Sequence, residues 1–343
     1  MSPFPSALPD PRVTPLRGGP VVRWGVLGPG RIAADFTDAV HAYTDQRVVA
    51  VGSRSAERAR AFAEPRGIIR VHGDYEQLVS DPEVDVVYIA TPHSEHRENA
   101  LLAIAAGKHV LIEKPIAVTA AEARDIRDAA AAAGVFAGEA MWSRYQPQTD
   151  VLVRLVADGG LGELRLVTAD FSGRSRFDPS GRAWDPALGG GALLDLGVYV
   201  LWFAHLLLGA PERMTVAGSL APTGVDDQAS LLLEYANGAQ AMLGTSLLFA
   251  SPSGALVCGT DARIEVDPMF LAPGGLTVVG PEGRRLRYAD DSGFVFRDGL
   301  AWQASAVAEY IAGGRVDSPL HPLSTAIDVL DSIDEARRTL GAL

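Results

Sequence analysis

An acid and a phenol stand four residues apart inside an otherwise apolar stretch, GGGALLDLGVYVLWFAH, at residues 189–205. On an α-helix this spacing puts Asp195 and Tyr199 on one face, one turn apart. Such a pair could hold a substrate hydroxyl and handle its proton. The glycines before the helix would let the backbone approach a ligand closely. The alternative is a core tyrosine with a satisfied hydroxyl and an aspartate that caps the helix.

A lysine provides a second group for proton transfer. The tripeptide EKP at 113–115 follows one apolar strand-like segment, and TP at 91–92 follows another. The carboxyl ends of parallel strands are where such sheets bind ligands, so we expect both turns at the edge of a binding cleft. Free lysine and tyrosine have pKa values of about 10.4 and 10, and a lysine close to the phenol would favour its deprotonated form. The residues predicted at these strand ends are Thr91, Pro92, Glu113 and Lys114.

A glycine-rich turn, GVLGPGRIA at 25–33, lies between a strand-like and a helix-like segment. Glycines allow a tight turn and close approach of the backbone to a pyrophosphate, and the N-terminus of the following helix donates amide hydrogens to it. An ordinary glycine turn is the alternative, but the position between these elements favours a dinucleotide site. The residues predicted to contact the cofactor here are Gly28, Pro29, Gly30, Arg31 and Ile32.

The next predicted strand ends in VGSRSAER, which bears on the choice of cofactor. An NAD site usually places an acid there to hold the ribose 2′-hydroxyl, whereas this chain has Ser53 and Arg54, with Arg58 one helical turn later. A hydroxyl and guanidinium groups suit a 2′-phosphate better, so NADP is favoured and NAD remains possible. Alternatively, Arg54 is a solvated surface residue or stacks on the adenine.

Strand and helix patterns alternate through the first part of the chain. Apolar segments such as VDVVYIATP (84–92) alternate with helical ones such as TAAEARDIRDAAAAAG (119–134), where Thr119 and Glu122 have the spacing of a capping box. This alternation predicts an α/β domain with a doubly wound parallel sheet, the Rossmann arrangement.

The pattern changes near residue 142 to longer strands with few helices. Turn signals such as Asn237-Gly238 separate some of these strands. They predict an α+β domain built on a large, open, mainly antiparallel sheet. We therefore expect a disordered, proline-rich lead-in over 1–20, a dinucleotide-binding domain over 21–141, and a substrate and dimerisation domain over 142–343.

Bulk properties exclude several classes of protein. The 343 residues carry a net charge of −12, which disfavours nucleic acid as a partner. The single cysteine, Cys258, permits no internal disulfide. The lead-in lacks the apolar segment of a signal peptide, and the apolar run at 197–210 is too short to span a bilayer. These features predict a soluble cytoplasmic protein without a membrane partner, and no metal site is predicted.

Four motifs in order carry a resemblance: GVLGPGRIA, TPHSEHRENALLAIAAGKHVLIEKP, GEAMWSRYQPQ and GGGALLDLGVY. From about residue 21 onward the chain resembles the glucose–fructose oxidoreductase / inositol dehydrogenase / MocA family. It looks most like the branch of dihydrodiol dehydrogenases and NADP-dependent xylose dehydrogenases. The resemblance implies a Rossmann domain, a C-terminal domain with an open sheet, a nicotinamide cofactor, and homodimers or homotetramers formed through that sheet.

The resemblance also implies roles for individual residues. Lys114 matches the family's EKP lysine, which binds cofactor or substrate and serves in proton transfer. Asp195 and Tyr199 match the D-x-G-x-H acid–base pair, with tyrosine replacing the histidine of many members. This departure argues against a histidine base and suits the dihydrodiol and xylose branch. His93 stands where many members have asparagine and is expected near the cofactor. His96 is counted with the cofactor residues, although a structural role is the preferred interpretation.

One residue of the EAMW motif and one just beyond it complete the predicted site. Trp142 and Arg144 are expected to contact substrate, and a surface role for Arg144 stays open. Two classes of function remain. One is an NAD(P)-dependent dehydrogenase or reductase acting on a sugar, a polyol or a cyclic diol. The other is a cofactor-binding regulator without turnover. The joint presence of Lys114, Asp195 and Tyr199 favours the enzyme.

Overall fold

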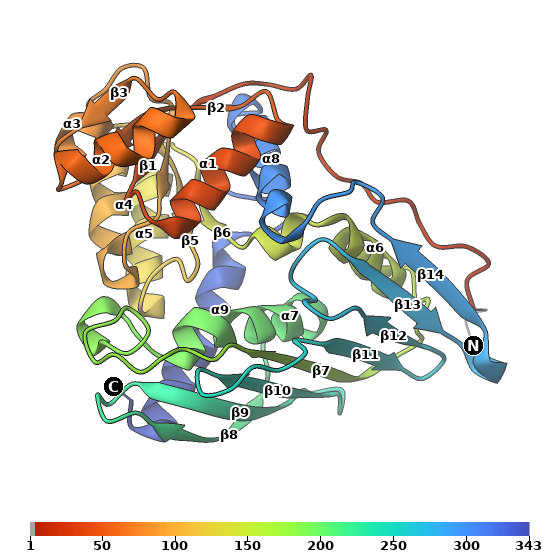
Figure 1. Cartoon of the computed structure of the whole chain (residues 1–343). Coiled ribbons are helices and arrows are strands. Elements are labelled where there is room, and N and C mark those ends of the chain that lie inside the picture. Colours follow the sequence, from red (N-terminus) through yellow and green to blue (C-terminus); the bar gives the residue numbers. More distant parts are fainter. Residues whose placement is uncertain (1–3, 343) are drawn as a thin grey trace. The chain divides into compact units, whose positions relative to one another are not determined.

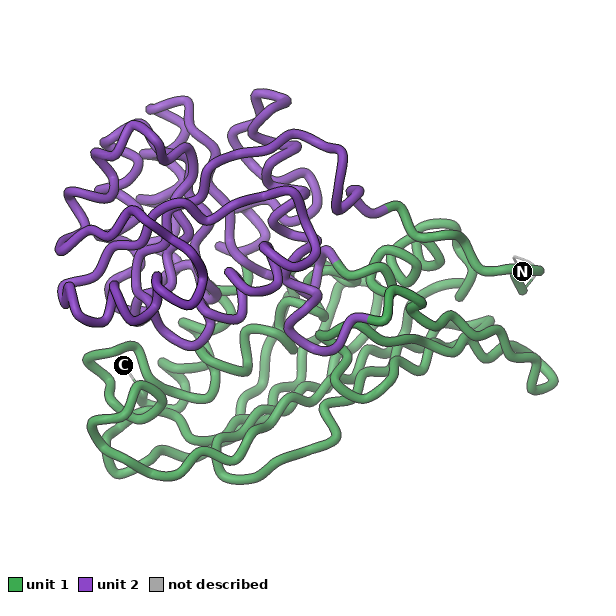
Figure 2. The backbone as a smooth tube through the Cα atoms, turned by 45° about the horizontal axis from the view of Figure 1, so that its top comes forward, with its two compact units in different colours: residues 1–12, 146–293, 328–343 green, residues 13–145, 294–327 purple. Residues whose placement is uncertain are grey.

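The chain divides into two compact units that interleave along the sequence. The computed structural model describes residues 4–342. The α/β unit contains residues 13–145 and 294–327, and the large-sheet unit contains residues 1–12, 146–293 and 328–343 (Figure 2). The boundary predicted at 141/142 falls shortly before Gln146, where the large-sheet unit resumes.

A six-stranded, fully parallel sheet forms the centre of the α/β unit. Its strand order is β3-β2-β1-β4-β5-β6, so the chain changes direction across the sheet between β1 and β4. This is the order of a dinucleotide-binding Rossmann fold and confirms the predicted doubly wound sheet. The strands are β1 Arg23–Leu27, β2 Arg47–Gly52, β3 Arg70–His72, β4 Val86–Ile89, β5 His109–Glu113 and β6 Ala137–Ala140.

Helices cover this sheet, and two pairs of them, α1 with α8 and α4 with α5, pack side by side (Figure 1). The Thr119 hydroxyl caps α5 by accepting from the Glu122 amide at 3.3 Å, as its spacing predicted. The helices are α1 Arg31–Tyr43, α2 Ala56–Ala63, α3 Tyr75–Val79, α4 His96–Ala105, α5 Ala120–Ala133 and α8 Leu300–Ala312. Short 3₁₀ turns are η1 Glu64–Arg66, η2 His93–Glu95, η3 Trp142–Tyr145 and η7 Phe296–Gly299.

Apolar strands account for the core of the α/β unit. Every residue of β4 is buried, as a strand covered on both faces requires. The rings of Phe36 and Tyr88 stack with centroids 3.9 Å apart, and Trp24 meets Phe36 edge-on at 5.3 Å. This packing fixes β1 and β4, the two strands whose carboxyl ends carry the predicted cofactor turn and Thr91.

An eight-stranded sheet forms the large-sheet unit, in the order β14-β13-β12-β11-β7-β10-β9-β8. Among the strands that the structure describes here, only β7 and β10 pair in parallel, which confirms the predicted large, mainly antiparallel sheet. Gly238, with φ +78°, turns the chain between β9 and β10 as the Asn-Gly signal predicted. The strands are β7 Leu164–Ser172, β8 Arg213–Leu220, β9 Asp226–Glu234, β10 Gln240–Ser246, β11 Ala255–Gly259, β12 Arg263–Val266, β13 Gly275–Val279 and β14 Arg285–Ala289.

Few helices accompany this sheet. They are α6 Pro147–Ala157, α7 Val198–Leu208 and the C-terminal part of α9 Leu323–Leu340, with short 3₁₀ turns η4 Pro186–Leu188 and η6 Pro281–Gly283. Helix α7 packs on β7 and β10 and is buried from Val198 to His205. By length and composition alone, the helical stretch Pro186–Leu208 could cross a membrane. This was not predicted, because only the shorter apolar run at 197–210 was considered. Its most apolar window is 78% buried, as in a core helix.

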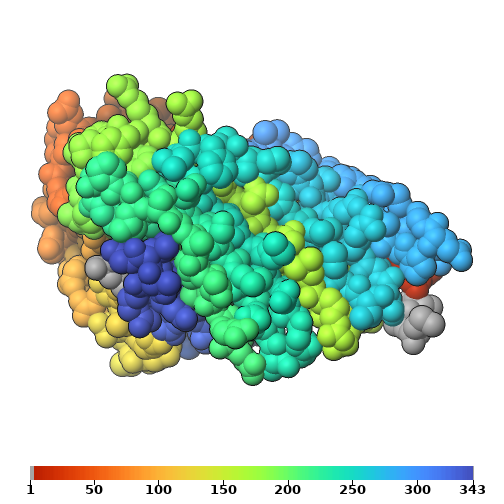
Figure 3. Space-filling model, turned by 90° about the horizontal axis from the view of Figure 1, so that it is seen from below, coloured from red at the N-terminus to blue at the C-terminus, as the bar shows by residue number. Residues whose placement is uncertain are grey.

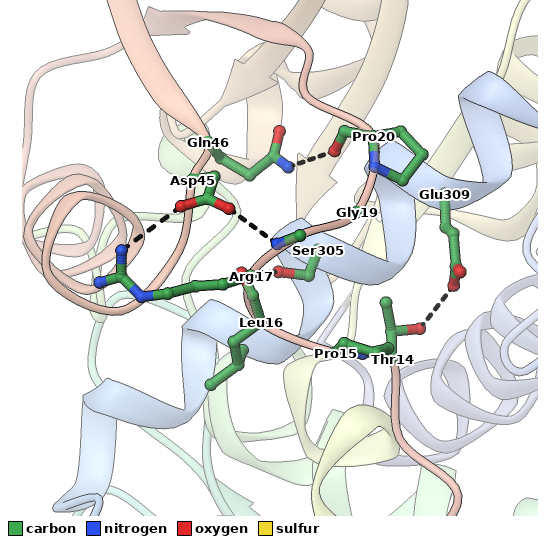
Figure 4. A pocket seen from close by; sticks show the side chains of 11 residues that line it. Thr14, Pro15, Leu16, Arg17, Gly19, Pro20, Asp45, Gln46, Ser305 and Glu309 are labelled. Carbon is green, nitrogen blue, oxygen red and sulfur yellow. Dashed lines mark hydrogen bonds and ion pairs between the residues drawn. The ribbon is translucent and has the colours of Figure 1, made fainter.

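The proline-rich segment before β1 contains neither helix nor strand over residues 4–20. Residues 1–3 of the predicted disordered lead-in lie outside the described residues. Within the α/β unit, Asp45 accepts from the Arg17 guanidinium and the Gly18 amide, and the Thr14 hydroxyl donates to Glu309. These residues line a cavity of about 320 Å³ (Figure 4), and none of the predicted site residues does.

Candidate functional site

The turn after β1 requires glycine at one position and leaves open space at the next. Gly28 has φ +85°, and a Cβ there would lie 2.8 Å from both the Ala90 carbonyl oxygen and the Thr91 amide nitrogen. A Cβ on Gly30 would have only the Gly28 carbonyl oxygen near it, at 4.0 Å. The first glycine therefore permits close packing against the end of β4, and the second leaves room for a ligand beside the backbone.

The N-terminus of α1 faces this space. Its first helical hydrogen bond runs from the Ala34 amide to the Gly30 carbonyl at 3.0 Å, so the amides of Arg31 and Ile32 precede the helical ladder. The first turn carries no acidic residue and no side-chain cap. Such an end attracts an anion through its amides and its dipole. The turn and the helix therefore fit the pyrophosphate of a dinucleotide.

The predicted ribose end of the site follows β2. Ser53 is buried, and its hydroxyl accepts from the Ser55 amide at 3.1 Å, which shapes the turn. Arg54 extends from this turn with a side chain that is 71% exposed, and its guanidinium lies 2.9 Å from a Glu95 carboxylate oxygen. Arg58 lies exposed on α2. The structure thus pairs Arg54 with an acid that was not predicted from the sequence.

His96 ties together the two strand ends that were predicted to bind ligand. Its Nδ1 lies 2.8 Å from the Pro115 carbonyl oxygen and its Nε2 lies 2.9 Å from the Thr91 carbonyl oxygen. The ring is fully buried, and burial lowers the pKa of His96 to about 4. His93 packs edge-on against it, with ring centroids 5.6 Å apart. This geometry supports the structural role preferred for His96.

Buried side chains hold the turn that presents Lys114. The Glu113 carboxylate accepts from the Tyr88 hydroxyl and from the Lys114 amide, and burial raises the pKa of Glu113. The Lys114–Pro115 peptide is cis. Glu113 therefore lies inside the unit behind the turn, whereas the Lys114 side chain is half-buried.

A second buried acid holds the residue after this turn. The Glu139 carboxylate accepts from the Ile116 amide at 2.9 Å and lies 2.7 Å from His321 Nε2. Both side chains of this pair are at least 98% buried. Neither Glu139 nor His321 was predicted from the sequence, although Glu139 belongs to the GEAMW motif. The Lys114 turn is thus fixed by His96 on one side and by Glu139 on the other.

Trp142 and Arg144 are engaged by the returning segment of the α/β unit. Trp142 is buried, meets Phe296 edge-on at 5.9 Å, and has the Arg297 guanidinium 5.4 Å from its ring centre. The Arg144 Nε donates to the Leu320 carbonyl at 3.0 Å. These contacts give both residues structural roles, and their predicted contacts with substrate stay predictions.

The acid and the phenol of the opening motif lie in the large-sheet unit. Residues Leu193–Gly197 form a turn of π-helix before α7, where the spacing predicted a regular α-helix. Asp195 is paired with Arg182 through two contacts, at 3.2 and 3.0 Å. Tyr199 is buried and meets Phe171 edge-on at 5.4 Å. Arg182 is a residue that the sequence argument missed.

A fully buried aspartate explains the wide first turn. One oxygen of Asp226 accepts from the Leu193 amide at 2.6 Å. Gly191 has φ +123°, and a Cβ there would lie 2.5 Å from the other oxygen of this carboxylate. Burial raises the pKa of Asp226 to about 6. Asp226 thus anchors the segment that carries Asp195, and it does so only because residue 191 is glycine.

Each unit therefore gathers its own share of the predicted site. The α/β unit collects the glycine turn, Arg54, Thr91, the two histidines and Lys114 at the carboxyl edge of its sheet. The large-sheet unit holds Asp195 and Tyr199 at the start of α7. Among residues 4–342, no three His, Cys, Asp or Glu side chains form a group that could hold a metal ion.

Comparison with known families matches both units. Residues 22–140 match the oxidoreductase family with an NAD-binding Rossmann fold, GFO/IDH/MocA. Residues 150–265 match the GFO/IDH/MocA C-terminal domain. The two matches together span more than half of the chain.

Individual proteins resemble the chain over nearly its whole length. Trans-1,2-dihydrobenzene-1,2-diol dehydrogenase of Mus musculus is 36% identical, with 93% of this chain and 97% of that protein covered. Aldose-aldose oxidoreductase of Caulobacter crescentus, complexed with glycerol, has a TM-score of 0.83 at 26% identity, covering 93% and 97% of the two chains. A 3-ketoreductase of Actinomadura kijaniata, in complex with NADP and TDP-benzene, has a TM-score of 0.80 at 25% identity, covering 92% and 97%.

Proposed function

Because the chain belongs to the GFO/IDH/MocA oxidoreductase family, we propose that it transfers hydride between a nicotinamide dinucleotide and a hydroxyl or carbonyl group of a sugar, polyol or cyclic diol. The observation that carries this proposal is the 36% identity to a diol dehydrogenase over 93% of the chain. The glycine turn supports it, because the open space beside Gly30 suits a pyrophosphate.

In this proposal the chain's own groups handle the proton, while the bound dinucleotide gives or accepts the hydride. Tyr199 takes the hydroxyl proton during oxidation and returns it during reduction. Lys114 takes part in the same proton transfer. Asp195 holds a substrate hydroxyl, and Arg182 fixes the orientation of its carboxylate.

We propose NADP as the preferred dinucleotide, with NAD as a weaker alternative. The turn after β2 offers the Ser53 hydroxyl and the guanidinium groups of Arg54 and Arg58, which suit a 2′-phosphate. The structurally similar 3-ketoreductase has been solved with NADP, which supports the same preference.

The outer face of the eight-stranded sheet is the proposed interface between copies of the chain. Figure 3 views the molecule from below, where the green to light-blue atoms of the large-sheet unit form a broad surface. Met242 is 57% exposed and Phe249 is 50% exposed in this unit. Burying such apolar area would stabilise a homodimer or homotetramer. The cytoplasm is the proposed compartment, which the single cysteine supports.

A substrate screen tests the proposed function directly. Purified protein is mixed with NADP or NAD and with a panel of aldoses, polyols and cyclic diols, and absorbance of the reduced nicotinamide is followed. We expect turnover with at least one member. The reverse reaction is tested with the matching carbonyl compounds and the reduced dinucleotide. A protein that binds the dinucleotide but shows no turnover in either direction would favour the regulator over the enzyme.

Substitution of Arg54 tests the preference for NADP. Arg54→Ala should weaken NADP binding by about 1–3 kcal/mol, the scale of a charged hydrogen bond, and leave NAD binding nearly unchanged. Fluorescence titration with both dinucleotides measures this. Arg60→Ala removes an exposed arginine of the same helix region and should change neither affinity. Equal losses for both dinucleotides would overturn the assignment of Arg54.

A further inference from the structure

The acid beside Arg54 has no role in the proposed chemistry. Glu95 ends the 3₁₀ turn η2 between β4 and α4, and its carboxylate lies 2.9 Å from the Arg54 guanidinium. The Glu95 side chain is 25% exposed, against 71% for Arg54. Tyr75 completes the cluster: burial raises the pKa of its hydroxyl most, the charge of Glu95 raises it further, and Arg54 lowers it.

The backbone fixes Glu95 in this position. Its amide donates to the Pro92 carbonyl at 2.9 Å, which closes the turn that follows β4. His96 also anchors this turn, because its Nε2 lies 2.9 Å from the Thr91 carbonyl oxygen. The carboxylate is therefore part of the strand end that faces the ribose side of the predicted dinucleotide site.

Any phosphate bound by Arg54 would come close to this carboxylate. The phosphate and the Glu95 carboxylate would both contact the same guanidinium, each at about a hydrogen-bond length. The two anions would therefore lie only a few ångströms apart. A phosphate monoester carries about −1.5 to −2 charges at neutral pH and is repelled by a carboxylate at that range. The 2′-hydroxyl of NAD is uncharged and meets no such repulsion.

We propose that Glu95 sets the balance between the two dinucleotides, by holding part of the charge of Arg54 and opposing the 2′-phosphate of NADP. This inference rests on the proposed role of Arg54 in binding that phosphate. Glu95 moderates the preference for NADP and keeps NAD usable by the same site. Glu95 is thus a residue that determines dinucleotide specificity from the turn after β4. The residues that usually distinguish NAD from NADP lie on the turn after β2.

Replacing the acid by its amide tests the proposal. Glu95→Gln keeps the size of the side chain and removes its charge. We expect NADP affinity to rise about threefold to tenfold, the scale of one charge interaction near the surface. NAD affinity should stay within about twofold. Fluorescence titration of the purified protein with NADP and NAD measures both, without any need for a substrate.

A matched control lies on the same helix. Glu98→Gln removes a carboxylate of α4 that pairs with Arg97 and not with Arg54, so the ratio of the two affinities should not change. Unchanged thermal unfolding of both variants would show that the fold is intact.

Three outcomes would overturn the proposal. An unchanged affinity ratio in Glu95→Gln, together with the expected loss of NADP binding in Arg54→Ala, would reject Glu95 and leave the preference for NADP standing. Weaker NADP binding in Glu95→Gln would show that the acid positions Arg54 for the phosphate. An Arg54→Ala variant with full NADP affinity would reject both the role of Arg54 and the inference built on it.

Discussion

The two units hold their predicted site residues by different means. In the α/β unit, the glycine turn, Thr91 and Lys114 follow directly from the ends of parallel strands, and buried groups such as His96 bind the backbone of those turns. In the large-sheet unit, Asp195 depends on Arg182, which lies in an irregular loop, and its helical turn depends on Asp226 of β9. The first arrangement follows from strand order, and the second from side-chain pairs that the chain brings together over long range.

This difference predicts different sensitivities. Substitutions at strand-end turns of the α/β unit should act on dinucleotide binding. Substitutions of the supporting side chains in the large-sheet unit should act on substrate binding and on stability, because those residues belong to a different unit from the dinucleotide turn. Four predictions test this contrast.

The largest effect concerns one residue from each unit. Lys114→Ala and Tyr199→Phe should each lower kcat by about 10²- to 10⁴-fold, the range for a positioned proton-transfer group. If the two residues act as one catalytic pair, the double variant should be little worse than either single variant. Steady-state kinetics on a substrate found by the screen measure kcat for all four proteins.

The outcome of this comparison decides how far the units cooperate in chemistry. Full additivity of the two losses would show separate roles for Lys114 and Tyr199. A Tyr199→Phe protein with normal kcat would return the phenol to a packing role against Phe171. Unchanged thermal unfolding of the Tyr199→Phe variant, which keeps the ring, serves as the control for folding.

The second prediction concerns the glycine turn of the α/β unit. Gly28→Ala should lower stability by roughly 2–5 kcal/mol, because it combines a left-handed φ with a Cβ only 2.8 Å from backbone atoms of β4's end. Dinucleotide affinity should fall with it. Gly134→Ala is the control, since φ is +66° there but a Cβ meets nothing within 4 Å. Equal effects of the two variants on dinucleotide affinity would contradict a specific role for the turn.

The same contrast governs how much the sequence could predict. Apolar strands with glycine at their ends, and helices capped by residues such as Thr119, are local patterns, so the doubly wound sheet was predicted correctly. The position of the Lys114 turn followed from the same alternation. Asn237-Gly238 identified a hairpin of the large sheet for an equally local reason.

Long-range pairs left no comparable signal. Arg182 and Asp226 are ordinary charged residues in the sequence, and nothing in their spacing connects them to residues 193–195. The π-helical turn was missed because it depends on the Leu193 amide turning toward Asp226, which only the packing of β9 provides. Glu95 could not be predicted at the ribose site because it follows a different strand, β4, and only the fold brings it to the turn after β2.

The third prediction uses the pH dependence of Asp226. Unfolded aspartate titrates near 3.8, and burial raises the pKa of folded Asp226 to about 6. Between these values the folded state binds more protons than the unfolded state, so its contribution to stability falls as the pH rises from about 4 to about 6 and is constant above. Two pKa units correspond to about 3 kcal/mol. Asp226→Asn should lack this fall, so wild type should lose stability relative to the variant over that range.

Denaturant unfolding of both proteins at several pH values measures the difference. Asp227 and Arg337 also act on this carboxylate, and both stay unchanged in the variant. Asp178→Asn is the control, because hydrogen bonds from Ser180 lower the pKa of exposed Asp178 and its contribution has the opposite sign. A wild type whose stability relative to Asp226→Asn does not change between pH 4 and pH 6 would show that the buried carboxylate is not protonated in this way.

The smallest effect is expected at Arg182. Its side chain is half exposed where it pairs with Asp195, so the pair should contribute less than about 1 kcal/mol to stability. If Asp195 holds a substrate hydroxyl, loss of its partner should leave the carboxylate less well oriented in the ground state and the transition state alike. Arg182→Gln should therefore raise KM severalfold, with kcat within about twofold of wild type and unchanged dinucleotide affinity. Arg176→Gln, on the same loop beside Asp178, should change none of these constants. A fall in kcat approaching that of Tyr199→Phe would instead show that Arg182 itself contacts the reacting group. The loop that carries Arg182 would then belong to the catalytic site of the large-sheet unit, in addition to the segment that Asp226 anchors.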